Sequence, residues 1–372
     1  MNEVKKNKNY LSLAKVSSWT GLSRIFGLIR DVVTTNLLGA SVFHDIFVVT
    51  LKIPNLFRRF FAEGAFNQAF IPIYSDYQKG NDEKNTQEFI NSLAGSFLSI
   101  LFLFTILVLL ITPIFIFIFA PGFYYDDSKR IIAIDLLRIM FPYLALISLV
   151  SFASGIQNTH EKFSIPAFTP LIFNITLIVA AIFIAPIINL PVYALAWGVL
   201  IAGFLQLLIH IYALKNINRL PTPKINFSHP GQINVLKLMI PAILAGGIVQ
   251  INLLIDTIFA SLLQTGSPTW LYVSDRLIQF PMGIFAIAIG TILLPALSKI
   301  DVATNKKLFI HELQKGQRFV LFIGIPSLIG LYLCSTDLIG TIFFRGEFTA
   351  NDVHQASLSL MAYSIGLPFF ML

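Results

Sequence analysis

Long apolar stretches follow one another along almost the whole chain, separated by short polar segments. A helix needs about 20 apolar residues to cross ~30 Å of hydrocarbon, and about ten ranges here reach that length or approach it. Their apolar residues are continuous rather than alternating, which predicts helices and not a transmembrane barrel. The pattern therefore predicts an all-α polytopic membrane protein with spans near 16–38, 43–77, 89–119, 132–157, 166–186, 191–214, 233–263, 269–297, 319–336 and 355–372.

The second apolar stretch is unusual because it contains ionisable side chains and a helix-breaking residue. The segment "LKIPNLFRRFFAEGAF" contains Lys52, Pro54, Arg58, Arg59 and Glu63. Asp45, Lys52 and Arg59 recur every seven residues and fall on one helical stripe. We expect Pro54 to bend this span, and the charged stripe to face protein or a wet cavity rather than lipid.

Composition supports a lipid environment for most of the surface. Hydrophobic residues make up 56% of the chain and charged residues 12%, about half of the ~25% that is usual in soluble domains. The single cysteine, Cys334, excludes an internal disulfide and a cysteine metal cluster.

Lysine and arginine residues predict the orientation of the spans. With the N-terminus in the cytoplasm, the basic loops at 78–88, 158–164, 215–232 and 299–318 all lie on the inner side. The outer loops then contain only Lys129, Arg130 and Arg345. The net charge of +7 is thus explained mainly by topology, and we expect no nucleic-acid partner.

The chain also contains a weak internal repeat. "QAFIPIYSDY" resembles "TILLPALSKI", and "LRIMFPYLALISL" resembles "SLSLMAYSIGLPF", both at an offset of about 220 residues. We expect an N-lobe of six spans at 1–220 and a C-lobe of about four spans at 221–372. Two lobes of this kind would be parallel repeats around a central cavity. The second lobe would then be incomplete, and we expect the chain to be a truncated transporter.

Arginines inside the predicted spans indicate an anionic substrate. Span one contains Arg24, Arg30 and Asp31, and span eight contains Asp275 and Arg276. Arginine forks match phosphate oxygens, and basic residues outnumber acids in these spans. Local ion pairs, or side chains that reach the headgroup region, are alternatives that the sequence leaves open.

Several motifs resemble one known family nearly end to end. They are "SRIFGLIRD", "KIPNLFRRFFAEGAFNQAFIPIYSDY", "APGF", "FSIPAFTP", "INFSHPG" and "SDRLIQFP…GTILLPALSK". Together they are similar to the MurJ (MviN) lipid II flippases of the multidrug/oligosaccharidyl-lipid/polysaccharide exporter superfamily. The resemblance implies export of lipid II, the undecaprenyl-diphosphate-linked peptidoglycan precursor, across the bacterial cytoplasmic membrane by alternating access. Lipid II and membrane lipids are the partners that it implies.

The resemblance also implies roles for individual residues. Substrate-binding positions would be Arg24, Arg30, Arg276, Asp45, Lys52 and Arg58. From the charges themselves, and not from the resemblance, we expect the gate candidates to be Asp31, Arg59, Glu63 and Asp275. Some family members bind sodium through an acid that matches Asp256. We therefore expect no cofactor other than a sodium ion at this residue, and a hydrogen-bonded structural acid is the alternative there. Gln279 stands where some members have glutamate.

Other classes fit the sequence less well. A polysaccharide exporter or a drug/cation antiporter of the same superfamily would share the architecture, but an antiporter should show buried carboxylates rather than surplus arginine. An enzyme acting on polyprenyl phosphate needs metal-binding acids or a catalytic base, and the sequence contains no HExxH motif, P-loop or intramembrane acid pair. We therefore expect a transporter rather than an enzyme.

Overall fold

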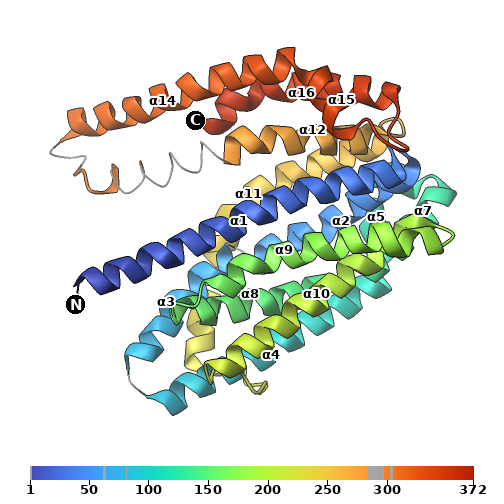
Figure 1. Ribbon diagram of the computed structural model, residues 1–372. Coiled ribbons are helices and arrows are strands. Elements are labelled where there is room, and N and C mark those ends of the chain that lie inside the picture. Colours follow the sequence, from blue (N-terminus) through green and yellow to red (C-terminus); the bar gives the residue numbers. More distant parts are fainter. Residues whose placement is uncertain (1, 62–63, 81, 284–292, 294–296, 302–304) are drawn as a thin grey trace. The chain divides into compact units, whose positions relative to one another are not determined.

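The computed structural model (Figure 1) describes every residue except 1, 62–63, 81, 284–292, 294–296 and 302–304. Regular structure in the described residues is helical throughout, and they contain no β-strand. The all-α architecture expected from the continuous apolar stretches is therefore confirmed.

The residues divide into two compact units. The first comprises Met1–Thr34 and Ile46–Leu263, and the second comprises Thr35–Asp45 and Gln264–Leu372. Residues 221–263, which the internal repeat assigns to the second lobe, thus pack with the first unit. The lobe boundary at residue 220, based on the repeat, stays a prediction.

The first unit is a bundle of long helices with short interruptions (Figure 1). In chain order its helices are α1 (Asn2–Leu38, whose end enters the second unit), α2 (Val42–Phe61, whose start belongs to the second unit), α3 (Ala65–Lys79), α4 (Glu83–Leu110), α5 (Thr112–Phe119), α6 (Pro121–Tyr124), α7 (Asp127–Met140), α8 (Tyr143–Thr159), α9 (Ser164–Val179), a π-helical turn η1 (Ala180–Ile184), a 3-10 turn η2 (Ala185–Ile187), α10 (Pro191–Asn216) and α11 (Pro230–Leu262).

Some predicted spans consist of two helices rather than one. The range 43–77 divides into α2 and α3, and Gly64 just before α3 has a φ of 59°, a conformation that glycine adopts easily. Pro54, the expected bend, lies inside α2. The range 132–157 divides at Phe141 and Pro142, because proline cannot donate the backbone hydrogen bond of a continuing helix.

Five helical stretches in the described residues are long and apolar enough to cross a membrane. They are Glu83–Leu110, Asp127–Thr159, Ser164–Ile187, Pro191–Asn216 and Lys306–Leu333. Pro230–Leu244 and Gln250–Leu262 are shorter apolar stretches. Several predicted spans are thus present as apolar helices, and the total of about ten stays a prediction.

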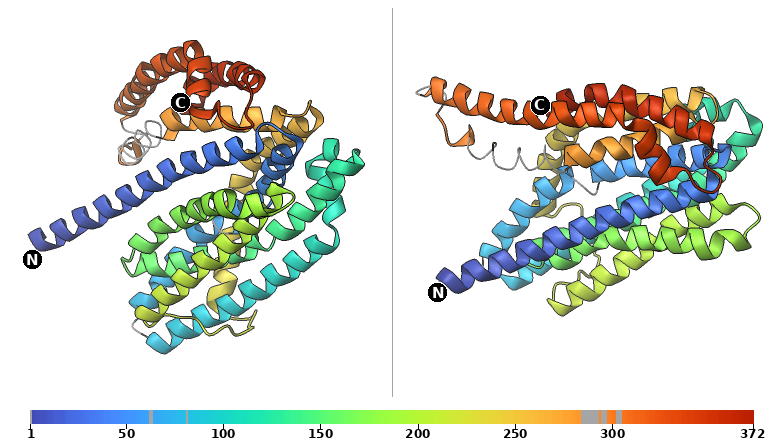
Figure 2. Two further views of the ribbon diagram at one scale, coloured as in Figure 1. Left: turned by 45° about the vertical axis from the view of Figure 1, so that its right-hand side comes forward. Right: turned by 45° about the horizontal axis from the view of Figure 1, so that its top comes forward.

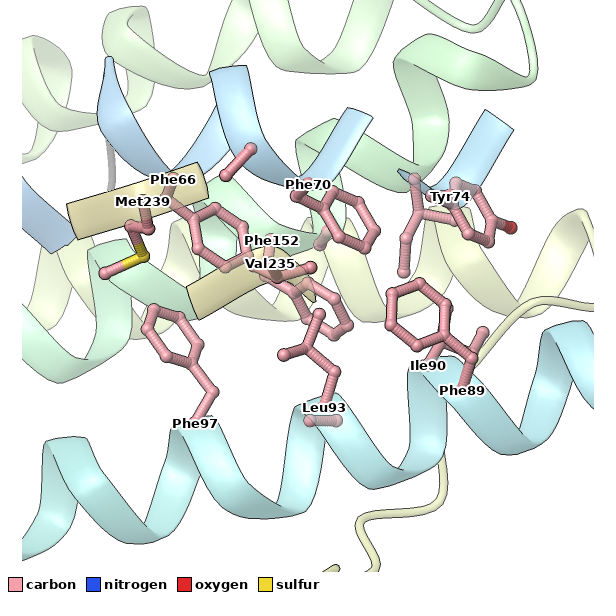
Figure 3. Close-up of a cluster of buried hydrophobic side chains, with 14 of the residues drawn as sticks. Phe66, Phe70, Tyr74, Phe89, Ile90, Leu93, Phe97, Phe152, Val235 and Met239 are labelled. Carbon is pink, nitrogen blue, oxygen red and sulfur yellow. The ribbon is translucent and has the colours of Figure 1, made fainter. Parts of the chain in front are cut away.

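An aromatic cluster packs four helices of the first unit together, namely α3, α4, α8 and α11. Figure 3 shows side chains of α3 facing side chains of α4, with residues of α8 and α11 beside them. The ring centroids of Phe66 and Phe97 lie 4.9 Å apart, and those of Phe70 and Phe89 lie 6.2 Å apart. Lipid tails are as apolar as these rings, so close packing rather than exclusion of water is the main force holding the four helices together.

The polar segment 217–229, which joins the two predicted lobes, lies along α4. The Lys224 N–H donates to the Asn91 carbonyl at 2.9 Å, and the Thr222 N–H donates to Asn91 Oδ1 at 2.8 Å. A Cβ on Gly95 would lie 2.3 Å from the Lys224 carbonyl carbon, so the contact requires glycine. The linker is therefore fixed to the first unit.

The second unit is built around α12 (Ser267–Pro281), α14 (Lys306–Leu333), α15 (Ser335–Phe343) and α16 (Ala350–Met371). Figures 1 and 2 show α14 and α16 side by side. Trp270 Nε1 on α12 donates to Asp352 Oδ1 on α16 at 2.9 Å. The loop before α16 also holds the end of α1, because the Glu347 N–H donates to the Asn36 carbonyl at 3.0 Å.

Candidate functional site

A buried polar cluster joins α1 to α9 in the first unit. Arg30 donates from Nε and Nη2 to Asp31 Oδ1, at 3.0 and 2.5 Å, and from Nη1 to Asn174 Oδ1 at 3.0 Å. The three residues are 9%, 1% and 6% exposed. The guanidinium also lies 5.7 Å from the Phe173 ring centroid. A cation in so apolar a helix pair requires such partners, and its planar fork is thereby held in one orientation.

Arg24 has a different environment from Arg30. It is exposed, and within the described residues it has no ion-pair or hydrogen-bond partner. Asp31, which shares a helical face with Arg24 in an ideal helix, forms its ion pair with the adjacent Arg30. The structure therefore brings together Arg30 and Asp31, while Arg24 stays accessible to a ligand.

The third predicted arginine lies in a second polar group, on α12. Arg276 is half-buried, and its Nη2 donates to the Tyr272 hydroxyl at 3.3 Å, with the guanidinium 5.5 Å from the Tyr272 ring centroid. Nη1 donates to Gln279 Oε1 at 3.4 Å, and Gln279 Nε2 donates to Asp275 Oδ2 at 2.5 Å. Gln279 thus connects Asp275 to Arg276, a link that needs a donor and an acceptor on one side chain.

Asp45 binds the beginning of α12. Its Oδ2 accepts from the Gly266 N–H at 2.6 Å, and its Oδ1 accepts from the Thr269 N–H at 3.1 Å and the Thr269 hydroxyl at 2.7 Å. The side chain is 2% exposed. The first N–H groups of a helix have no partner within the helix, and a carboxylate at its N-terminus accepts hydrogen bonds from them. Asp45 therefore fixes the position of the helix that carries Arg276.

The remaining charges of α2 become more exposed along the helix. Lys52 and Arg58 are half-buried, whereas Arg59 is exposed and donates to Gln250 Oε1 of α11 at 3.4 Å. Glu63, the expected partner of Arg59, lies outside the described residues. The predicted stripe of Asp45, Lys52 and Arg59 thus runs from a buried to an exposed end.

The expected sodium ligand, Asp256, is exposed on α11. Among the described residues, no three His, Cys, Asp or Glu side chains gather into a group that could hold a metal ion. Asp256 is therefore not part of a three-ligand group within the described residues.

Sequence reasoning missed Asn174, Tyr272 and Gln250, which contact Arg30, Arg276 and Arg59. The available signal for Asn174 was a lone amide in the apolar run "PLIFNITLIV". Polar residues inside such runs are costly unless bonded, so a partner was to be expected there.

Within each unit one arginine side chain is held in a defined orientation by its neighbours. The guanidinium groups of Arg30 and Arg276 are oriented by aromatic and amide neighbours, and Arg24 is accessible. A guanidinium group held in one orientation is a means of binding phosphate oxygens.

The sequence matches a family described as "Lipid II flippase MurJ" over residues 34–372. A similar curated relative is the "Probable lipid II flippase MurJ" of Vibrio cholerae serotype O1, 41% identical over 380 aligned positions. That alignment covers 100% of this chain and 72% of the relative.

Solved structures extend the comparison to the fold. A structure titled "Lipid II flippase MurJ, inward closed conformation" has a TM-score of 0.81 and 31% identity, covering 96% of this chain and 73% of the other. An inward-facing multidrug resistance MATE family transporter has a TM-score of 0.68 at 13% identity. It covers 94% of this chain and 79% of the other, and its low identity makes it evidence for the fold alone.

Proposed function

This chain belongs to the lipid II flippase MurJ family, and on that premise we propose that it moves lipid II from the inner to the outer leaflet of the bacterial cytoplasmic membrane. The observation that carries the proposal is the family match over residues 34–372. The apolar helices support a multi-pass membrane protein. The alternative of another transporter of the same superfamily has only the MATE fold likeness in its favour.

The substrate offers a diphosphate between a lipid tail and a sugar-peptide head, and the arginines are its proposed ligands. We propose that Arg24, Arg30 and Arg276 bind the diphosphate oxygens. Lys52 and Arg58, half-buried on α2, would contribute further positive charge along the path.

Asp45 takes part in a different way from the basic residues. We propose that it serves the site through α12, since its carboxylate binds the start of that helix. A carboxylate held this way would repel phosphate less than a free one, because its charge is compensated by N–H donors.

No bond of lipid II has to be broken for it to cross the membrane, so we propose transport by alternating access without catalysis. Charged residues that pair in one state and separate in another would form the gates. Asp31, Arg59, Glu63 and Asp275 are the proposed gate residues. The contact of Arg59 with Gln250 supports a role for Arg59 between α2 and α11.

A sodium ion bound through Asp256 is a separate proposal. Sodium prefers several oxygen ligands, and among the described residues Asp256 belongs to no group of three His, Cys, Asp or Glu side chains that could hold a metal ion. No step of transport is assigned to it. Replacing sodium with choline in a transport assay would test it, with Asp256→Asn as the variant that should abolish any sodium dependence.

The function is tested by depleting the protein in the bacterium that makes it and measuring how much lipid II can be reached from outside the membrane. We expect accessible lipid II to fall while total lipid II rises, and resupply of the protein to reverse both. Accessible lipid II that stays constant during depletion would contradict the proposal.

A further inference from the structure

Asn174 connects two parts of α1 through a single amide group. Its Nδ2 donates to the Ser23 carbonyl at 2.9 Å, and its Oδ1 accepts from Arg30 Nη1 at 3.0 Å. Ser23 and Arg30 are seven residues apart, which is about two helical turns, so both lie on the α1 face that meets α9.

Gly27 faces the Asn174 amide. It lies between Ser23 and Arg30 on the same face of α1, and a Cβ built on it would lie 3.5 Å from Asn174 Nδ2. That distance is an ordinary van der Waals contact, so an alanine would also fit beside the amide. The helix therefore presents a carbonyl, a glycine and a guanidinium in succession to one asparagine.

The two contacts require both ends of an asparagine amide. The Ser23 carbonyl can accept from Asn174 with its second lone pair, and Arg30 requires an acceptor. A leucine of similar shape supplies neither bond, and an aspartate supplies the acceptor but no donor. Since Asn174 is 6% exposed and Arg30 is 9% exposed, water has little access to replace either bond.

We infer that Asn174 is a positioning residue for the substrate: it orients the Arg30 guanidinium and fixes the α1 backbone directly before Arg24. The inference rests on the proposed function, because it assumes that these arginines receive the diphosphate. The two contacts that Asn174 makes from α9 then set Arg24 and Arg30, and a change at Asn174 acts on binding through both arginines.

The test uses the purified full chain and undecaprenyl diphosphate as the probe, with undecaprenol as the reference lipid. Asn174→Leu should weaken diphosphate binding by about tenfold, the loss expected from one hydrogen bond to a charged group. In an Arg30→Ala background the same change should cost clearly less than tenfold, because the guanidinium that Asn174 orients is gone and only its contact before Arg24 remains to be lost. Undecaprenol binding should not change, whereas a general loss of structure would lower both.

A second variant keeps the test decisive if Asn174→Leu does not fold. Asn174→Asp retains shape and the acceptor but places a negative charge beside Arg30, so it should also weaken diphosphate binding and leave undecaprenol binding unchanged. The matched control is Thr176→Val, which removes a hydrogen bond within α9 to the Ile172 carbonyl and should bind like the unchanged protein.

The outcomes separate this inference from the function it rests on. If the unchanged protein does not prefer undecaprenyl diphosphate to undecaprenol, both the arginine site and the role of Asn174 are overturned. If it does prefer the diphosphate and Arg30→Ala removes that preference, but both Asn174 variants bind like Thr176→Val, only the positioning role is overturned.

Discussion

Replacing Asp45 should loosen the start of α12 far more than replacing an ordinary helix cap. In Asp45→Ala, two backbone N–H groups and the Thr269 hydroxyl lose a charged acceptor at a site where Asp45 is 2% exposed and Thr269 is 0% exposed. Hydrogen bonds to charged groups contribute about 1.5–3 kcal/mol each, and the helix dipole adds up to ~2 kcal/mol in buried geometries.

These contributions overlap, because one carboxylate makes all of the bonds and water can fill part of the space left behind. We therefore expect Asp45→Ala to lower the free energy of unfolding by about 3–5 kcal/mol. Asp45→Asn keeps the shape but exchanges one acceptor oxygen for a donor, and should cost about 1–3 kcal/mol. The matched control is Asp126→Ala, since Asp126 caps α7 with a side chain that is 44% exposed, and its loss should be smaller than either.

Trp270, which directly follows Thr269, is a local reporter for this measurement. In a background with Trp19→Phe and Trp197→Phe, fluorescence during denaturant unfolding in mixed micelles follows α12 alone. The reasoning is wrong if Asp45→Ala and Asp126→Ala shift the transition equally, or if Asp45→Asn is as stable as the unchanged protein.

Three further predictions concern other parts of the chain. Gly122→Ala places a Cβ 1.9 Å from a backbone oxygen of α11 and should lower the free energy of unfolding by roughly 2–4 kcal/mol. In Gly21→Ala the new Cβ meets no atom within 4 Å, so this change should raise the free energy of unfolding by up to ~1 kcal/mol. Chemical unfolding of both variants measures the two opposite effects. Burial, with nearby positive charges, lowers the pKa of His160 below its ordinary 6.5. Because the unfolded chain then binds a proton more readily than the folded chain, the free energy of unfolding should fall as the pH drops below 6.5. His160→Gln should make the free energy of unfolding less dependent on pH in this range. Single cysteines at 299–318 in a Cys334→Ser background should resist an impermeant thiol reagent on intact cells, and labelling there would refute the assigned orientation.

The helices were predictable from the sequence because a long apolar segment in lipid must pair its own backbone N–H and C=O groups, and a helix does so within the segment. The interruptions were harder to place. Pro54 is tolerated within α2, while α7 and α8 are divided at Phe141 and Pro142. Whether a proline interrupts a membrane helix depends on how neighbouring groups pair the freed carbonyls, and the sequence does not contain that information.

The charged residues of the site were predictable as types, and their partners were not. Arg30 and Asp31 stand out because charges in an apolar helix are costly. The contact of Arg30 with Asn174 joins residues 144 positions apart, so neither helical periodicity nor spacing indicates it. Asp45 is similar: its place on a charged stripe was visible, but its partners Gly266 and Thr269 are brought to it by the fold.

The most direct measurement of the central claim is the movement of lipid II across a sealed bilayer. Vesicles that contain the protein and lipid II on the inner leaflet are treated from outside with an impermeant enzyme that cleaves lipid II. We predict that cleavage continues beyond the initially exposed fraction, and that Arg24→Lys slows it because lysine lacks the fork that binds two phosphate oxygens. Cleavage that stops at the same fraction as in vesicles without the protein would contradict the claim that this chain is a lipid II flippase.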